Sequence, residues 1–568
     1  MERKSKIAIT GITFVILVIV ISLGVMIKTR LTPSNEVMLL TDYYDIENDK
    51  ALIILHNRVY EEKALVINGR VYMDYETVVQ KFNHRFYWDI NENILIYTTP
   101  NEIIQAEAGS KQYSITKSMI KTQAYKEYSI VEVFSNDVYV ALDFIEEYSD
   151  IDVRYYEEPN RVVINYKWGE YLYTEVEKET QIRIEPNIKS SILVELKQGA
   201  SLIYADLDEA PKKGFVKVMT EDGVIGYVKE KHVKEGFYKS IESDFVEPVY
   251  TTQTRPYTIN MVFHQVFNNK AAGALEELLK ETKGVNVVSP TWFSITDVTG
   301  DISSLASHEY VNKAKELGVE VWALVDDFNS DVKMFDLLSH TSYRENLANK
   351  LVQAAIDYKI NGINIDFENI SSDAGKHYIQ FLRELSVKCR NNGIVLSVDN
   401  YVPAPYNRHY DLEEQGKIID YLIIMAYDEH YAGSDVAGPV ASLGFVKDAI
   451  DNTIAIVPNE KTIIAIPFYS RLWKESKDGD VSSEAYAMTP ASNIFKDNGV
   501  ELEWNETIGS YYGEFEKDDL TYKMWLEDPK SIEEKMKIIY EADTAGIAAW
   551  KLGLEKQEVW NVITRYLK

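Results

Sequence analysis

The second half of the chain alternates short apolar runs with stretches in which apolar residues recur at helical spacing. Runs rich in Val, Ile and Ala return throughout residues 255–568. Such runs, bounded by turn residues, are typical of strands buried on both faces, and their alternation with helices predicts a parallel sheet. Eight runs predict a closed (β/α)8 TIM barrel, an α/β fold. The predicted strands are residues 258–263, 285–290, 319–325, 362–367, 394–398, 421–426, 462–467 and 546–550.

Two further features of this region follow from the same pattern. Residues 474–530, between the seventh and eighth runs, are too long for a plain loop, so we expect a small inserted α+β lobe over the barrel mouth. Tyr378, Leu382, Leu385 and Cys389 recur at helical spacing. We therefore expect the single cysteine to be a core residue on the buried face of a helix. A single cysteine also excludes an internal disulfide.

Residues 56–168 contain a weak internal repeat. Asn68–Asp74 leads to Ile94–Tyr97, and Asn136–Asp143 leads later to Val162–Tyr166. Each copy predicts a hairpin, a short helix and a second hairpin, which together make a duplicated α+β domain. The segment resembles the small domain named after the amino-terminal part of copper amine oxidases. That resemblance implies a spacer or wall-facing module, without catalysis or copper binding.

Residues 171–235 have short strand patterns separated by turn residues and predict a small all-β barrel. An R-x-x-P motif ends at Pro186, the motif S-x-I-L-x-x-L-x-x-G ends at Gly199, and Asp222-Gly223 precedes Ile225–Val228. Asp-Gly between two β-rich runs favours a hairpin. The order of these motifs resembles a bacterial Src-homology-3 domain, which implies either binding of cell-wall peptide or a plain spacer.

An uncharged apolar stretch, Ile7–Ile27, lies near the start of the sequence and is followed by a polar stalk over residues 31–55. About 20 apolar residues span a bilayer core, and the slight excess of basic residues before the stretch favours a cytoplasmic amino end. A cleaved signal peptide usually has a shorter apolar stretch and a small-x-small site, which is not evident here. We therefore expect residues 1–30 to be a transmembrane anchor, with the rest outside the cytoplasm. Secretion after cleavage is the alternative.

The composition narrows the classes of function. The chain has 60 basic and 89 acidic residues and a net charge of −29, which argues against a nucleic-acid binder. Motifs for nucleotide binding, for a zinc hydrolase and for a serine hydrolase are absent from the sequence, so we expect neither a cofactor nor a metal. The 39 tyrosines and nine tryptophans suit carbohydrate stacking as well as ordinary core packing.

The most informative stretch is Asn361–Glu368, at the fourth predicted strand. Side chains alternate between the two faces of a strand, so Asn364, Asp366 and Glu368 share the barrel interior and approach its carboxyl end. Active sites of these barrels lie at that end. Three polar side chains facing a core are costly unless they are paired or hydrated. An exposed strand end or a casual cation site is the non-catalytic alternative.

This stretch resembles the D-G-x-D-x-D-x-E motif of family 18 glycoside hydrolases, the chitinase and N-acetylglucosaminidase family. The resemblance implies that Glu368 is the general acid and then the base, and that Asp366 orients the 2-acetamido group whose oxygen attacks the anomeric carbon, with retention. Asn361 and Asn364 replace aspartates of the motif. In the family the middle aspartate shares a proton with its neighbour. We expect the Asn364 amide to donate to Asp366 instead and to favour its ionised form.

Further matches lie at other predicted strand ends. Met425, Tyr427 and Asp428 match the family's M-x-Y-D motif, and Trp550 ends the eighth run. By resemblance, Tyr427 donates to the acetamide carbonyl, Asp428 binds a sugar hydroxyl or positions the tyrosine, and Trp550 lies beneath the sugar. Weaker candidates for sugar contacts are Trp525 in the inserted lobe, and Trp292, Tyr401 and Tyr469 near other strand ends.

The N-x-D-F-E-N form of the motif resembles the bacterial spore-germination and cell-wall group of the family, whose members cut N-acetylglucosaminyl bonds in peptidoglycan. The sequence therefore predicts a membrane-anchored glycosidase that acts on peptidoglycan or a related N-acetylglucosamine glycan. The alternatives are a non-catalytic lectin on the same barrel, a chitinase for exogenous chitin and a structural wall spacer.

Overall fold

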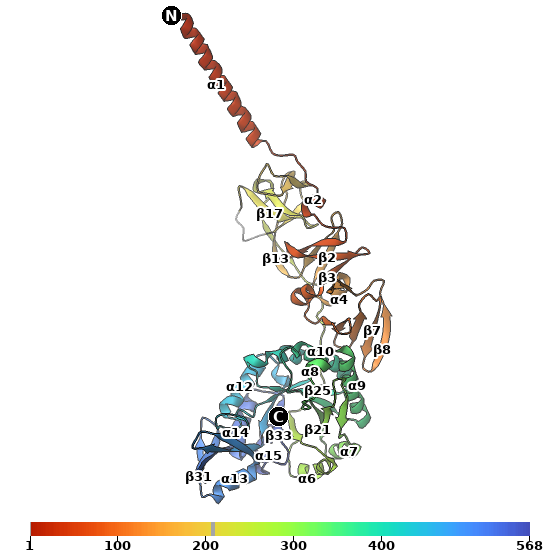
Figure 1. The fold of residues 1–568 in the computed structure, drawn as a ribbon, viewed down its shortest axis with the longest axis vertical. Coiled ribbons are helices and arrows are strands. Elements are labelled where there is room, and N and C mark those ends of the chain that lie inside the picture. The colour runs from red at the N-terminus through yellow and green to blue at the C-terminus, as the bar shows by residue number, and fades with distance from the viewer. Residues whose placement is uncertain (1, 206–210, 568) are drawn as a thin grey trace. The chain divides into compact units, whose positions relative to one another are not determined.

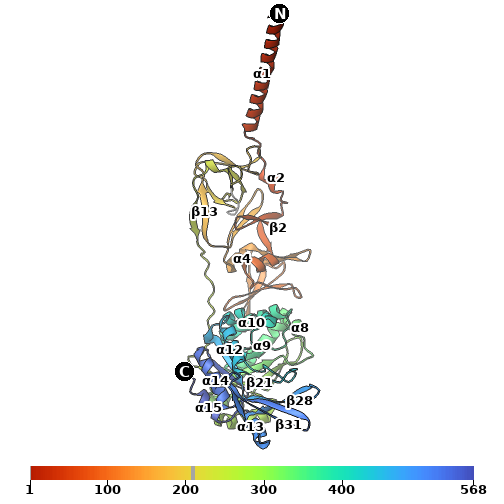
Figure 2. The same cartoon turned by 90° about the vertical axis from the view of Figure 1, so that its left-hand side faces the viewer.

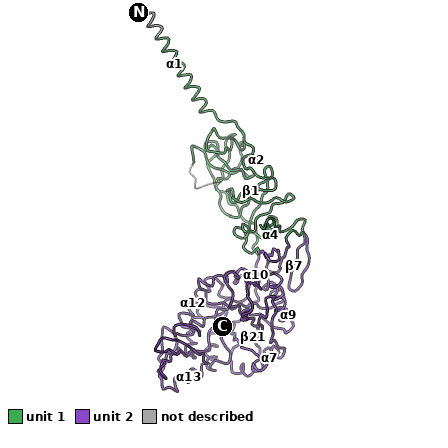
Figure 3. The backbone as a smooth tube through the Cα atoms, viewed as in Figure 1, with its two compact units in different colours: residues 1–86, 108–111, 126–247 green, residues 87–107, 112–125, 248–568 purple. Residues whose placement is uncertain are grey.

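The computed structural model describes residues 2–205 and 211–567, so residues 206–210 of the predicted domain 171–235 lie outside the described part (Figure 1). The chain divides into two compact units, coloured separately in Figure 3. The first comprises residues 1–86, 108–111 and 126–247. The second comprises residues 87–107, 112–125 and 248–568. The second unit thus combines the predicted barrel with a segment from the predicted spacer.

The second unit contains a closed barrel of parallel strands, which confirms the predicted fold class. Neighbouring strands pair in sequence, and the first strand pairs with both the second and the last, which closes the barrel. The strands are β20 (Ile259–His264), β21 (Val287–Ile295), β23 (Glu320–Asp326), β24 (Gly362–Asp366), β25 (Val395–Tyr401), β26 (Tyr421–Met425), β27 (Thr462–Pro467) and β33 (Gly546–Trp550). Each overlaps one predicted run.

Helices follow the strands and enclose the barrel, as Figures 1 and 2 show. They are α5 (Asn269–Gly273), α6 (Leu275–Lys280), α7 (His308–Glu316), α8 (Met334–Leu338), α9 (Thr341–Tyr358), α10 (Gly375–Asn392), α11 (Leu412–Ile418), α12 (Leu443–Ile454), α14 (Pro529–Glu541) and α15 (Glu558–Ile563). One core lies between strands and helices and includes Ile363 and Cys389, and a second fills the barrel interior with residues such as Trp322 and Ile423. The cysteine is buried in the first core, as expected.

The inserted lobe follows the seventh barrel strand, as predicted. It is an antiparallel sheet with one helix on it, and both views place β31 beside that helix (Figures 1 and 2). Its elements are β28 (Tyr469–Ser476), β29 (Val481–Ala487), α13 (Met488–Asp497), β30 (Glu503–Asn505), β31 (Ser510–Lys517) and β32 (Leu520–Leu526). A short strand, β22 (Ile302–Ser304), also extends the barrel sheet beside β21.

A second small sheet packs on the outside of the barrel. Its strands are β4 (Tyr87–Asp89), β5 (Ile94–Thr98), β6 (Ile103–Glu107), β7 (Gln112–Lys117) and β8 (Ile120–Tyr125). Tyr87, Ile96 and Ile103 form a buried cluster with Val387 of α10. The spacing of hydrophobic residues gave no sign of this contact, because it joins segments that are far apart in the sequence.

The first unit contains two seven-stranded sheets. The first sheet consists of β1 (Lys50–Leu55), β2 (Arg58–Ile67), β3 (Arg70–Asp74), β9 (Val131–Phe134), β10 (Asp137–Ala141), β11 (Asp152–Tyr156) and β12 (Arg161–Asn165), with α3 (Tyr75–Thr77) and α4 (Leu142–Tyr148) after β3 and β10. The second consists of β13 (Gly169–Glu175), β14 (Thr180–Arg183), β15 (Ile192–Leu196), β16 (Ser201–Tyr204), β17 (Phe215–Met219), β18 (Ile225–Lys229) and β19 (Phe237–Ile241). In both halves of the predicted repeat, a hairpin precedes a short helix.

The apolar stretch at the start of the chain lies in one helix, α1 (Glu2–Leu31), and a short helix α2 (Leu40–Tyr44) follows. The segment Ile9–Leu31 is long and apolar enough to cross a membrane, and none of it is buried against the rest of the protein. By length and composition alone, it fits a membrane anchor and a signal sequence equally.

Candidate active site

Strand β24 separates apolar from polar side chains as the alternation predicts. Ile363, Ile365 and Phe367 belong to the core between strands and helices. Asn364 and Asp366 are buried on the opposite face, and Glu368 follows at the carboxyl end of the strand. This is the end at which TIM barrels place catalytic groups.

A cavity of about 640 Å³ opens above these residues. This volume is in the range of small-molecule sites. Phe328, Tyr406 and Tyr431 are exposed aromatic side chains on its wall. The remaining lining residues are Phe263, Asp366, Glu368, Asp399, Tyr401, Val402, Met425, Tyr427, Asp428, Glu429, Phe445 and Trp550. None of these described lining residues is basic, so the cavity is acidic and aromatic.

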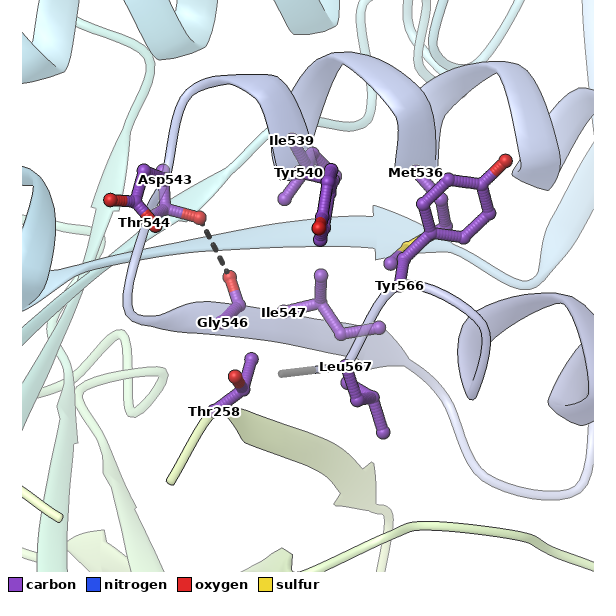
Figure 4. Close-up of a pocket in the computed structure, with 10 residues that line it drawn as sticks. All are labelled: Thr258, Met536, Ile539, Tyr540, Asp543, Thr544, Gly546, Ile547, Tyr566 and Leu567. Atoms are coloured by element: carbon purple, nitrogen blue, oxygen red, sulfur yellow. Dashed lines mark hydrogen bonds between the residues drawn. The ribbon is translucent and has the colours of Figure 1, made fainter. Parts of the chain in front are cut away.

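A much smaller hollow lies at the opposite end of the strands, between Thr258 and Gly546 (Figure 4). Its volume is about 20 Å³, close to that of one water molecule. Figure 4 shows mainly apolar side chains around it, with Ile539, Ile547 and Leu567 among them. It lacks the cluster of carboxyl groups that lines the large cavity, and this cluster makes the large cavity the candidate active site.

Glu368 is held in place from two sides. Tyr401 Oη donates to its Oε2 at 2.6 Å, and Asp327 Oδ1 accepts from its backbone N–H at 3.0 Å. Burial raises the pKa of Glu368, and the Tyr401 hydrogen bond partly offsets that rise. A carboxyl group with a raised pKa is suited to act as a general acid near neutral pH.

Asp366 is 6% exposed and lies among other carboxyl groups. Burial raises its pKa well above the ordinary value, and the charges of Asp399 and Glu368 raise it further. Its Oδ1 atom is buried and has no hydrogen-bond partner in the described chain. The site therefore favours the protonated form of Asp366 in the absence of substrate.

The expected hydrogen bond from Asn364 to Asp366 is not formed. Asn364 Nδ2 donates to Asp399 Oδ2 at 2.6 Å, and its Oδ1 accepts from Ser397 Oγ at 2.7 Å. The prediction that Asn364 favours ionised Asp366 was therefore wrong. The reason is register: Asn364 pairs with Ser397 across the β24–β25 ladder, so its amide faces the next strand.

The residues of the M-x-Y-D motif lie together at the end of β26. Tyr427 lines the cavity, and burial raises its pKa well above the ordinary value, so the phenol remains a proton donor. Tyr469 Oη donates to Asp428 Oδ1 at 2.6 Å, which makes Tyr469 a support for Asp428. Met425 also lines the cavity, and Trp550 contributes its ring beside Phe263, with the ring centroids 5.4 Å apart.

Three predicted sugar contacts, Trp292, Trp525 and Tyr469, are not among the residues that line the cavity. Trp292 is 2% exposed and packs edge-on against Tyr310 in the core between strands and helices. Its position on β21 points it outward from the barrel, so it is not placed to stack on a sugar. Trp525 lies on β32 with its ring against Tyr512, outside the residues that line the cavity.

Asp399 and Asp327 are site residues that the sequence analysis missed. Asp399 lines the cavity, and Asp327 holds the backbone after Glu368 by accepting from the N–H of Asn369 at 2.9 Å. A signal for Asp399 was available, because Ser397, Asp399 and Tyr401 alternate along β25 as the catalytic candidates alternate along β24.

Comparison with known proteins agrees with this geometry. The sequence model of the glycosyl hydrolases family 18 matches residues 224–555, and that of the copper amine oxidase N-terminal domain matches residues 54–164. The resemblances to family 18 and to the copper amine oxidase domain are thereby confirmed. The resemblance of residues 171–235 to a Src-homology-3 domain stays a prediction.

Individual relatives match over part of their length. The putative sporulation-specific glycosylase YdhD of Bacillus subtilis is 30% identical over 234 residues, which is 40% of this chain and 55% of YdhD. The cortical fragment-lytic enzyme of the same organism is 26% identical over 240 residues, 40% of this chain and 54% of that enzyme. The chain thus spans about half the length of these two relatives.

A solved structure shares the fold. The C-terminal domain of a putative chitinase from Desulfitobacterium hafniense superposes with a TM-score of 0.51 at 20% identity, covering 55% of this chain and all of that domain. The match of the family model to more than half of the chain carries the assignment, and the barrel and its carboxylates agree with it. The chain belongs to family 18 of the glycoside hydrolases.

Proposed function

We propose that the protein is a membrane-anchored glycosidase that hydrolyses β-1,4 N-acetylglucosaminyl bonds of peptidoglycan outside the cytoplasm, by substrate-assisted catalysis with retention. The observation that carries the proposal is Glu368, a carboxyl group of raised pKa that lines the cavity together with Asp366, Tyr427 and Trp550. The common glycosidase scheme of two catalytic carboxylates does not apply, since family 18 uses the substrate's own acetamido group.

The contacts of each residue suggest how the reaction proceeds. Because Tyr401 donates to Oε2 of Glu368, its Oε1 is the oxygen left to carry the proton for the leaving group. Asp366, once ionised, accepts the acetamido N–H and stabilises the positive charge that develops on that group. Tyr427 donates to the acetamide oxygen and directs it at the anomeric carbon. Glu368 then takes a proton from the water that opens the cyclic intermediate.

The choice of peptidoglycan rests on the wall-type form of the motif and on the relatives. One is named for sporulation and another for lysis of cortical fragments. Helix α1 and the second seven-stranded sheet, β13–β19, support action at the cell surface. The helix is proposed as the membrane anchor, and the sheet as a wall-binding or spacing module. The exposed aromatic side chains Phe328, Tyr406 and Tyr431 give the cavity rings on which sugars stack.

Digestion of purified peptidoglycan by the full chain in detergent tests the proposal. Mass spectrometry is expected to show new reducing N-acetylglucosamine ends with wild-type protein and none with Glu368→Gln. Glu413→Gln, which changes an exposed carboxyl group on α11, is the matched control and is expected to keep full activity. If the protein cleaves chitin and not peptidoglycan, chitin replaces peptidoglycan as the proposed substrate. New reducing ends that persist in Glu368→Gln would refute the assignment of Glu368 as the acid.

A non-catalytic lectin is the second candidate, because an acidic and aromatic cavity also binds sugars. The presence of Asp366, Glu368 and Tyr427 in one cavity favours the enzyme over the lectin. Glycan binding by wild-type protein without any release of reducing ends would favour the lectin.

A further inference from the structure

Asp399 is a buried carboxyl group beside Asp366, and it lies on a different strand from the family motif. It is 2% exposed on β25. The parallel register pairs Asn364 with Ser397 and Ile365 with Val398. The next residues along the two strands are Asp366 and Asp399, so their side chains share the interior face, with the strands about 4.8 Å apart.

Each carboxyl group of this pair has a buried oxygen without a hydrogen-bond partner in the described part of the chain. Asp399 Oδ2 accepts from Asn364 Nδ2 at 2.6 Å. Asp399 Oδ1 and Asp366 Oδ1 are both buried and have no hydrogen-bond partner among the described residues. Buried polar atoms are normally paired, so two such atoms on neighbouring carboxyl groups require an explanation.

The surroundings of the pair contain acids and phenols. The titratable groups that interact electrostatically with Asp366 or Asp399 are Asp326, Asp327, Glu368, Tyr378, Tyr401, Tyr410 and Tyr427. None of these is a cation that would stabilise two negative charges. Two adjacent buried carboxyl groups of this kind do not both ionise near neutral pH, whereas one proton held between them satisfies both orphaned oxygens.

We propose that Asp399 is a positioning residue that shares one proton with Asp366 and takes the place of the motif aspartate that Asn364 replaces. When the acetamido N–H of the substrate approaches Asp366, the proton passes from Asp366 to Oδ1 of Asp399. One O–H bond breaks and one forms, and no proton enters or leaves the pair. Asp366 is then ionised, and the Asn364 amide holds Asp399 by its other oxygen. The inference rests on the roles proposed above for Glu368 and Asp366.

Substitutions at position 399 separate proton sharing from a purely structural role. The full chain is assayed over a range of pH with a fluorogenic β-glycoside of N,N′-diacetylchitobiose, and folding is checked by thermal unfolding. In Asp399→Ala, Asp366 must release its proton to solvent, so the acidic limb of kcat/KM is expected to move up by about one pH unit or more. Asp399→Asn keeps nearly the same side-chain shape, but its amide always donates a hydrogen bond to Asp366 and so stabilises the ionised form. The acidic limb of kcat/KM is therefore expected to move to lower pH.

Relocation of the carboxyl group provides the second test. Asn364→Asp, added to Asp399→Ala, supplies a proton-sharing neighbour from β24 and is expected to return the acidic limb toward its wild-type position. If Asp399→Ala does not fold, the shift in Asp399→Asn decides the question. The role of Asp399 would be overturned if the acidic limb of kcat/KM stayed at the same pH in every folded variant at position 399 while Glu368→Gln abolished turnover. Turnover that survives in Glu368→Gln would instead overturn the catalytic assignment itself.

Discussion

Asp89, on the small sheet β4–β8, provides the N-terminal cap of barrel helix α9. Its Oδ2 accepts from the backbone N–H of Thr341 at 2.6 Å and from Thr341 Oγ1 at 2.5 Å, and its Oδ1 accepts from Asn91 N at 2.9 Å. Asp89 is 1% exposed, while the residue before the helix, His340, makes no side-chain cap among the described contacts. A carboxylate at this place also interacts favourably with the helix dipole.

Asp89→Ala should therefore destabilise the catalytic unit, although the substituted residue precedes the barrel by a long stretch of sequence. A lost cap costs about 1 kcal/mol and a lost hydrogen bond to a charged group about 1.5–3 kcal/mol, so we expect a loss of about 3 kcal/mol. At about 2–4 °C per kcal/mol for larger domains, the melting temperature should fall by about 6–12 °C.

Differential scanning calorimetry of the full chain measures this effect. Glu107→Ala, at an exposed carboxyl group of the same sheet, is the control and should change the melting temperature little. Asp89→Asn keeps an acceptor and should lie between the two. A fall of less than about 2 °C in Asp89→Ala would show that the sheet is not an integral part of the catalytic unit, and the cap reasoning would be refuted.

Three further predictions concern the site and a buried ion pair. Tyr401→Phe removes the donor that stabilises ionised Glu368, so its pKa should rise and the alkaline limb of kcat/KM should move to higher pH; an unmoved limb would contradict this. Tyr427→Phe should lower kcat by about 10²-fold or more with a smaller change in KM, as expected for a donor that acts on developing charge, and steady-state kinetics would show it. Lys535→Met breaks the buried pair with Glu527, whose atoms are 2.9 Å apart, and should cost about 3–5 kcal/mol in denaturant unfolding. Adding Glu527→Gln should recover much of the lost unfolding free energy, because it removes the charge left unpaired by Lys535→Met. If the free-energy changes of the two substitutions simply added, an unpaired buried charge would not be the cause of the loss.

The barrel and the positions of its catalytic candidates follow from local patterns. Apolar runs gave the eight strands, and alternation correctly placed Asn364, Asp366 and Glu368 on the interior face. Both depend only on residues that are close in the sequence, where periodicity is informative.

The remaining features depend on contacts between distant segments. Asp399 becomes part of the site through the register of β24 and β25, which also redirects the Asn364 amide. Trp292 is near a strand end but faces the helices, and its closeness to the strand end did not show which face of β21 it occupies. The contact of Asp89 with Thr341 joins residues 252 positions apart, and no local pattern predicts such a pairing.

The measurement that tests the central claim most directly is the configuration of the first product. Proton nuclear magnetic resonance, recorded early in the hydrolysis of an N-acetylglucosamine oligomer by the full chain, distinguishes the two anomers before they equilibrate. Substrate-assisted catalysis through Glu368 and Asp366 predicts the β-anomer, which retains the configuration of the cleaved bond. An initial α-anomer would show inversion and would contradict the account.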